Sequence, residues 1–261
     1  MKNSTTMLLA VLCLSIGSVH GQMGRPGGMG ASRNGPQITA AMAKLFGQNS
    51  AFSADVESQT QMSKDNTVTM PGKIAFDSGK SRFEMNMSDA KGSGMSPQMA
   101  AQMKSMGMDS LVTISRPDSK TLVIYPGLQS YIEIPGQDSG TNKSGADFKI
   151  QVTELGKETV DGHPCVKNKA VVTDDEGKTH ESTVWNATDL KNFPVKIESA
   201  EQGVASTMLF KNIKLSKPEA SLFETPSGYK KYDDQMQLMQ AEVMKRMGGS
   251  AMPGGMRPEH P

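Results

Sequence analysis

Short stretches of alternating apolar and polar residues, separated by tight turns, fill most of this chain of 261 residues. Phe52, Ala54 and Val56, for example, alternate with polar side chains, which is typical of a strand buried on one face. The other stretches with strand character are residues 67–76, 81–87, 109–115, 121–125, 130–134, 148–155, 165–173, 181–185, 195–199 and 205–215. Most connections are short, which favours antiparallel neighbours because parallel strands need long crossovers. The pattern predicts a mainly β fold, a large curved antiparallel sheet or half-open barrel of about 10–11 strands.

Three stretches instead have the period of a helix and are expected to cover this sheet. The first begins at Pro36 and carries apolar residues through Phe46. The second is rich in methionine and lies in an insertion at residues 92–108, where Ser96 is a suitable N-cap and Pro97 a suitable first residue. The third is a C-terminal helix at residues 233–247. These elements predict one sheet domain with a helical lid at residues 36–247.

Methionine is unusually frequent, with 21 residues in the chain. Met95, Met99, Met103 and Met106 recur at i, i+4, i+8 and i+11, so on a helix they share one narrow face. Such a thioether stripe is either a soft apolar surface that adapts to greasy ligands or a set of ligands for Cu(I). No histidine lies within this segment, which favours the apolar alternative.

The ends of the chain differ from the domain between them. Residues 1–21 combine a short basic start, an apolar run and small residues before Gly21, which predicts a secretory signal peptide cleaved near Gly21. Residues 22–35 read as a flexible Gly-rich lead-in and residues 248–261 as a disordered tail. No other stretch is apolar and long enough to span a bilayer. The mature protein is therefore expected to be soluble and either periplasmic or secreted.

Several classes of function lack support in the sequence. The net charge is +1 without a basic block, which argues against a nucleic-acid partner. No nucleophile elbow, phosphate loop or metalloprotease helix is present, so neither catalysis nor a cofactor is expected. Cys165 would be the single cysteine after signal cleavage and is expected to be buried as a small apolar residue.

The order of several short motifs resembles a known family. The motifs are residues 51–54 (AFSA), 72–76 (GKIAF), 82–85 (RFEM), 119–126 (SKTLVIYP) and 220–229 (ASLFETPSGY). Their order resembles that in the periplasmic outer-membrane lipoprotein carrier (LolA-like) superfamily. The similarity covers residues 37–234, and it implies a half-open barrel of about eleven strands whose helices cover an apolar cavity for acyl chains. The carriers also have a basic Arg-Pro turn near residues 77–80 that this chain lacks, and the Met-rich helix is an insertion relative to them.

The function expected from these patterns is that of a binding or carrier protein, and the hypothesised mechanism is that the Met-bearing helices move aside to expose an apolar cavity. The ligand is expected to be a lipid or an acylated protein, with transient envelope proteins as further partners. The residues expected to line the cavity are Phe76, Phe83, Met85, Met99, Met103, Met106, Ile114, Val123, Ile132, Met239 and Met244.

Two alternatives stay open at this level. A metal-binding module would use Met95, Met99, Met103 and Met106 as ligands for Cu(I). A non-catalytic envelope scaffold would bind only other proteins and would have a filled core in place of a cavity.

Overall fold

The computed structural model describes residues 40–63, 66–92, 94–116, 121–134, 149–173, 177–201 and 204–248. The signal peptide, the lead-in and the tail beyond Gly248 lie outside these residues, so they stay predictions. Across the described residues, none of the helices is both long and apolar enough to cross a membrane.

Alternating burial accounts for the strands, and all of them belong to one sheet of twelve. In β3, for instance, buried and half-buried residues alternate without interruption, because successive side chains point to opposite faces. The strands are β1 (Ala51–Ser63), β2 (Asn66–Asp77), β3 (Lys80–Asn86), β4 (Ser110–Ser115), β5 (Thr121–Tyr125), β6 (Ser130–Ile134), β7 (Lys149–Val160), β8 (His163–Thr173), β9 (Thr179–Ala187), β10 (Phe193–Glu201), β11 (Val204–Lys214) and β12 (Lys230–Tyr232). The predicted mainly β fold is confirmed, and each predicted strand is present.

The sheet has the order β12-β6-β5-β4-β3-β2-β1-β11-β10-β9-β8-β7. Strands β1 to β6 form one meander and β7 to β11 a second, and the antiparallel pairing of β1 with β11 joins the two halves. The sheet is mixed and not purely antiparallel, because β12 pairs with β6 in parallel. No pairing between β7 and β12 exists, so the sheet stays open with these two strands at its edges.

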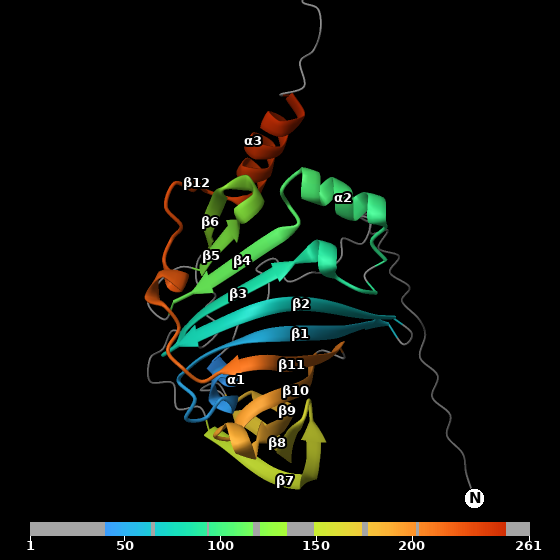
Figure 1. Cartoon of the computed structure of the whole chain (residues 1–261), viewed down its shortest axis with the longest axis vertical. Helices are drawn as coiled ribbons and strands as arrows, with labels where there is room; N and C mark the ends of the chain where they lie inside the picture. The colour runs from blue at the N-terminus through green and yellow to red at the C-terminus, as the bar shows by residue number, and fades with distance from the viewer. Residues whose placement is uncertain are drawn as a thin grey trace, which may run out of the picture. The chain divides into compact units, whose positions relative to one another are not determined.

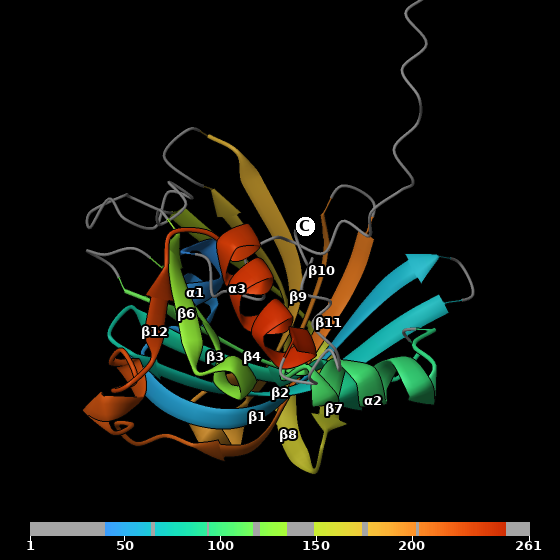
Figure 2. The ribbon, with the colours of Figure 1, turned by 90° about the horizontal axis from the view of Figure 1, so that it is seen from above.

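Within the described ranges, three α-helices accompany the sheet: α1 (Ala40–Leu45), α2 (Pro97–Ser105) and α3 (Gln235–Gly248). The predicted start of α2 is confirmed, since the Ser96 hydroxyl accepts a hydrogen bond from the Met99 backbone N–H at 3.1 Å. Figure 2 shows α1 and α3 within the curve of the sheet and α2 at its margin. We call the face that carries α1 and α3 the inner face.

The core under α1 is built from aromatic rings. Phe46, directly after α1, is 1% exposed and inserts among four other phenylalanines with ring centroids 4.6–6.1 Å away. These rings come from four strands in both halves of the sheet: Phe52 of β1, Phe76 of β2, Phe193 of β10 and Phe210 of β11. Six residues of helix are too few to be stable alone, so Phe46 and the neighbouring Leu45 hold α1 in place.

Two further cores complete the fold. On the inner face, Leu238 of α3 is fully buried against Val123, Ile132 and Tyr232. On the opposite, outer face, Phe223 of the 3-10 helix η4 (Ala220–Phe223) covers a separate cluster. Arg116 Nε donates to the Phe223 carbonyl at 2.9 Å and thereby fastens the segment to the sheet. Figure 1 shows α3 beside β6 and β12, and α2 beyond the end of β3.

Because Phe46 contacts rings in both halves of the sheet, we expect Phe46→Ala to lower the free energy of unfolding by about 3–5 kcal/mol. Urea denaturation followed by circular dichroism measures this change. The control is Met236→Ala, whose side chain is 71% exposed and whose loss should change stability by less than about 0.5 kcal/mol. Equal effects of the two substitutions would contradict the proposed role of Phe46.

Candidate functional site

Most of the strand residues predicted to line a cavity lie on the inner face, but inside filled cores. Phe76, Phe83 and Met85 are 5–7% exposed and belong to the core under α1. Val123 and Ile132 belong to the core under α3. The space over these residues is therefore occupied by Phe46 on one side and Leu238 on the other.

Ile114 lies on the outer face, which corrects its predicted position. Phe83 of the inner face pairs with Thr113 of β4, so the next residue along β4 points the other way. Ile114 is fully buried in the cluster that Phe223 covers. The sequence pattern of β4 did not reveal this because Val112, Thr113 and Ile114 are all buried, so both faces are covered and alternation is lost.

The Met-rich helix does not cover the sheet, contrary to the prediction. Helix α2 has no buried residue, and Met99 is 54% exposed. Met103 and Met106 are half-buried and belong to none of the three cores. The helix lies against the 3-10 helix η1 (Met87–Asp89) at the end of β3.

Helix α3 covers part of the inner face, but with a different side from the one predicted. Met239 packs against the filled core under α3 and does not line a cavity, whereas Met244 is 70% exposed. Among the α3 side chains that the structure describes, those of Leu238 and Glu242 are buried. Glu242 is accommodated because its Oε1 accepts a hydrogen bond from the Tyr232 hydroxyl at 2.6 Å.

An open cleft lies beside α1, between this helix and the edge of the sheet. We call it the α1 cleft; its volume is about 350 Å³. Its sheet side consists of inner-face residues from three strands: Ile150 and Val152 of β7, Asn168 and Ala170 of β8, and Val184 and Asn186 of β9. Ile150 and Val152 are 41% and 56% exposed, so the sheet side presents apolar surface to solvent.

Amides organise the polar part of the α1 cleft. Asn168 donates to Asn186 Oδ1 at 2.9 Å, and Asn186 in turn donates to the Asn192 carbonyl at 2.9 Å. Asn49, 8% exposed, donates to the carbonyls of Phe46 at 3.0 Å and of Lys191 at 3.3 Å. These bonds tie the end of α1 to the turn at residues 191–192 and fix the width of the cleft.

Two lysines contribute to the rim of the same cleft. Lys44 of α1 and Lys191 of the turn are both exposed and belong to its lining. A cleft with an apolar floor, amide groups and a basic rim can hold an apolar chain and place a negative group at its mouth.

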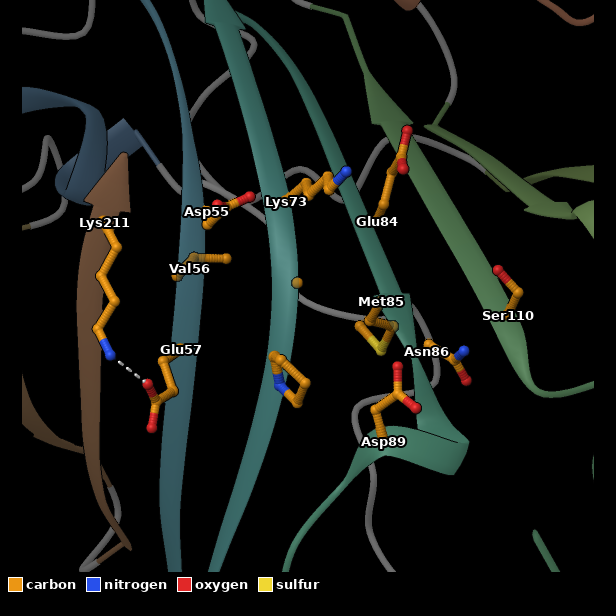
Figure 3. Close-up of a pocket in the computed structure, with 12 residues that line it drawn as sticks. Asp55, Val56, Glu57, Lys73, Glu84, Met85, Asn86, Asp89, Ser110 and Lys211 are labelled. Carbon is orange, nitrogen blue, oxygen red and sulfur yellow. Dashed lines mark hydrogen bonds and ion pairs between the residues drawn. The ribbon is translucent and has the colours of Figure 1, made fainter. Parts of the chain in front are cut away.

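A second hollow lies on the outer face and is charged (Figure 3). Its volume is about 410 Å³. Asp55, Lys73 and Glu84 are cross-strand partners on β1, β2 and β3, so opposite charges face each other across the strands. Beside them, Lys211 Nζ donates to Glu57 Oε2 at 2.8 Å, and this hydrogen bond lowers the pKa of the Glu57 carboxyl. Apolar atoms of Val56, Pro71 and Met85 also line the hollow, between these charged side chains.

Cys165 is buried, as predicted, and its surroundings do not activate it. Burial raises the pKa of the Cys165 thiol, and its Sγ donates to the His163 carbonyl at 3.3 Å. The His163 ring is 2.8 Å from Asp189 Oδ2, and this hydrogen bond lowers the pKa of Asp189. The imidazole therefore engages a carboxylate instead of the thiol, and the three groups do not form a nucleophile with its base.

Within the described ranges, no group of three or more His, Cys, Asp or Glu side chains could hold a metal ion. Of the metal candidates from the sequence, Met99 and Met103 lie on α2, Met106 is its C-cap, and Met95 precedes the extended N-cap Ser96 and so lies outside the helix.

Ile150 and Val152 were not among the site residues predicted from the sequence. They alternate with polar residues as any half-buried strand does, and a core position was the default for them. Their exposure follows from the position of β7 at the edge of the sheet, which depends on the topology. The only local sign of this exposure in the sequence was the number of polar residues around them in β7, which the structure shows to be exposed as well.

Comparisons with known proteins concern the family and the fold. The sequence model of a family described as a domain of unknown function (DUF4412) matches residues 56–193. The comparison with curated proteins found no match.

Solved structures similar to this chain include a LolA superfamily protein from Nitrosomonas europaea (10% identity, TM-score 0.38, covering 72% of this chain and 96% of that one). Another is the lipoprotein LppX of Mycobacterium tuberculosis (12% identity, TM-score 0.35, covering 62% and 85%). A third is a putative outer membrane lipoprotein-sorting protein domain from Vibrio parahaemolyticus (12% identity, TM-score 0.31, covering 77% and 94%). At these identities and TM-scores, nothing about ligands carries over from them.

Because the Cys165 thiol is buried and its pKa is raised, we expect it to react slowly with a thiol reagent in the folded protein. Ellman's reagent at pH 8, applied to a Cys13→Ser variant in which Cys165 is the sole thiol, measures the rate. Unfolding in urea should accelerate the reaction by at least about 100-fold, since exposure restores the ordinary thiolate fraction. Rapid labelling of the folded protein would instead reveal an accessible, activated thiol.

Proposed function

The chain belongs to the family described as a domain of unknown function (DUF4412), and we propose that this member is a non-catalytic binding protein for an amphiphile, with an acyl chain held in the α1 cleft. The single observation that carries the proposal is the exposed apolar floor of that cleft, formed by Ile150 and Val152 beside buried Ala170 and Val184. Exposed apolar surface that is contiguous and concave is typical of ligand sites.

The size and chemistry of the cleft support a small amphiphile. A volume of about 350 Å³ lies in the range of small-molecule sites. A chain lying on Ile150 and Val152 would remove their exposed surface from water, which stabilises a complex by roughly 25 cal/mol per Å² of apolar area buried. The basic side chains of Lys44 and Lys191 at the rim favour a ligand whose head group is negatively charged.

The proposed mechanism differs from the displacement of Met-rich helices that the sequence suggested. The methionines of α2 lie outside the cleft, so they play no part in it. Helix α1 forms one wall of the cleft. Leu45 and Phe46 line this wall and also pack into the core beneath the helix. The cleft is open without any movement of α1, so binding requires no opening step.

Delivery of lipids or acylated proteins outside the cytoplasm is part of the same proposal. The signal-peptide pattern at residues 1–21 supports export to the periplasm or beyond. An acylated protein would present the same apolar chain to the cleft as a free lipid does.

We expect Val152→Asp to weaken the binding of an acyl ligand by at least about tenfold, which corresponds to about 1.4 kcal/mol, because it places a carboxylate on the apolar floor. Fluorescence of cis-parinaric acid on titration with the purified protein measures the affinity. Leu155→Asp is the matched control, since Leu155 is also on β7 and 54% exposed but does not line the cleft. Absence of binding by the unaltered protein, or equal losses in both variants, would refute the lipid site and favour a scaffold that binds only proteins.

The head-group preference has its own test. We expect Lys191→Glu to weaken binding of a fatty acid several-fold while leaving binding of the corresponding fatty alcohol nearly unchanged, because only the acid carries a charge. Added salt should reduce the difference by screening. Lys157→Glu, an exposed lysine on β7 outside the cleft, makes the same change in net charge and should alter neither affinity. If Lys191→Glu weakened the affinity for the alcohol as much as the affinity for the acid, Lys191 would act by shape and not by charge.

A further inference from the structure

The methionines of α2 are not used to hold the fold together. Of the methionines that the structure describes, those in or against the three cores are Met42, Met70, Met85, Met87, Met108, Met208 and Met239. Met95, Met99, Met103 and Met106 belong to none of these cores. Their apolar volume therefore does not account for their presence at regular spacing on one helix.

Helix α2 turns its thioethers toward one side. Met99, Met103 and Met106 follow one another at i, i+4 and i+7, which places them on a single face. Of the residues on the other faces, Ala100 is half-buried, whereas Gln98, Ala101, Gln102, Lys104 and Ser105 are exposed. Met103 and Met106 are half-buried, so the methionine face is the side of the helix turned toward the protein. Its exposure is intermediate, which leaves it accessible from solvent.

The segments on either side of α2 also carry methionines. Helix α2 contacts η1, whose first residue is Met87. The Met108 backbone N–H donates to the Met103 carbonyl at 2.9 Å and folds the chain back onto the end of the helix. The Met87 side chain packs against the core under α1 and that of Met108 against the core under α3, so the methionines left to form a site are those of α2 and its two ends.

The helix that carries these side chains is fixed at both ends. Ser96 caps its N-terminus, and at its C-terminus Gly107 lies against Gly127 so closely that a Cβ on Gly127 would be 2.7 Å from the Gly107 Cα. A defined backbone with flexible side chains suits a site in which several sulfur atoms must turn toward one ion.

We propose that Met99, Met103 and Met106 of α2, with Met95 at its entrance, bind one Cu(I) ion. Neighbours at i+3 and i+4 on a helix have Cβ atoms about 5–6 Å apart, and three rotatable bonds let each Met sulfur reach a common point between them. Uncharged thioethers are soft ligands that select Cu(I) over the hard or borderline cations. The site is separate from the α1 cleft and does not depend on the proposed lipid binding.

The first test is metal uptake by the whole protein. Isothermal titration with Ag(I), a redox-stable ion of the same class, and competition for Cu(I) with bicinchoninate should each show one tightly bound ion. The double variant Met99→Leu/Met103→Leu should bind at least about tenfold more weakly, because leucine keeps the volume and helix preference of methionine but has no sulfur. The control Met236→Leu/Met244→Leu replaces two exposed methionines of α3 and should bind as the unaltered protein does.

Two additional readouts distinguish a thioether site from any other. Uptake should be constant between pH 5 and pH 8, since thioethers carry no proton to lose, whereas sites of His, Cys or carboxylate release protons on binding. The methyl resonances of Met99, Met103 and Met106 in a ¹³C-methionine NMR spectrum should shift on addition of Ag(I).

The proposal is overturned if the protein takes up no Ag(I), if the α2 double variant binds as well as the unaltered protein, or if the α3 control loses binding equally. The cleft variant Val152→Asp should leave metal uptake unchanged, so failure of the lipid proposal and failure of the metal proposal are separate results.

Discussion

The pairing of β1 with β11 is the interaction on which the rest of the molecule depends. It is the single hydrogen-bonded connection between the meander of β1 to β6 and that of β7 to β11 in the described sheet. The partners are distant in the sequence, since Glu57 and the Lys211 that donates to it are 154 positions apart. The ring cluster around Phe46 lies directly on this joint and draws on β1, β2, β10 and β11. Strand pairing and aromatic packing thus reinforce each other where the two halves meet.

This arrangement decides where a ligand can and cannot lie. At the joint, the inner face is filled by Phe46, and near β6 it is filled by Leu238. Beyond the end of α1, where the sheet continues to β7, Ile150 and Val152 stay exposed, because nothing in the described residues packs over them. Because the short helix α1 and the core beneath it fill the centre of the half-open sheet, the space for a ligand lies near its β7 edge, in the α1 cleft.

Local patterns predicted the strands and helices well, because the spacing of apolar residues, the turn residues and the helix caps all depend on residues close together in the sequence. Each predicted strand is present, and Ser96 caps α2 as expected. The exception is β12, three residues long and parallel to β6; a parallel edge strand leaves neither a hairpin turn nor a long alternation in the sequence. The burial of Glu242 was also beyond prediction, since it depends on the Tyr232 hydroxyl. The placement of the α2 methionines beside η1, and the exposure of β7, follow from the topology and not from their own sequences.

The long separation between β1 and β11 also bears on how the chain folds. Each meander consists of neighbours in sequence, whose pairing closes only short loops, whereas joining the halves closes one of more than a hundred residues. We expect the two meanders to gain structure first and the joint, with Phe46 between its rings, to form late. Until then the apolar sides of both meanders are exposed to water, so the interval before closure is when the chain is most prone to aggregate.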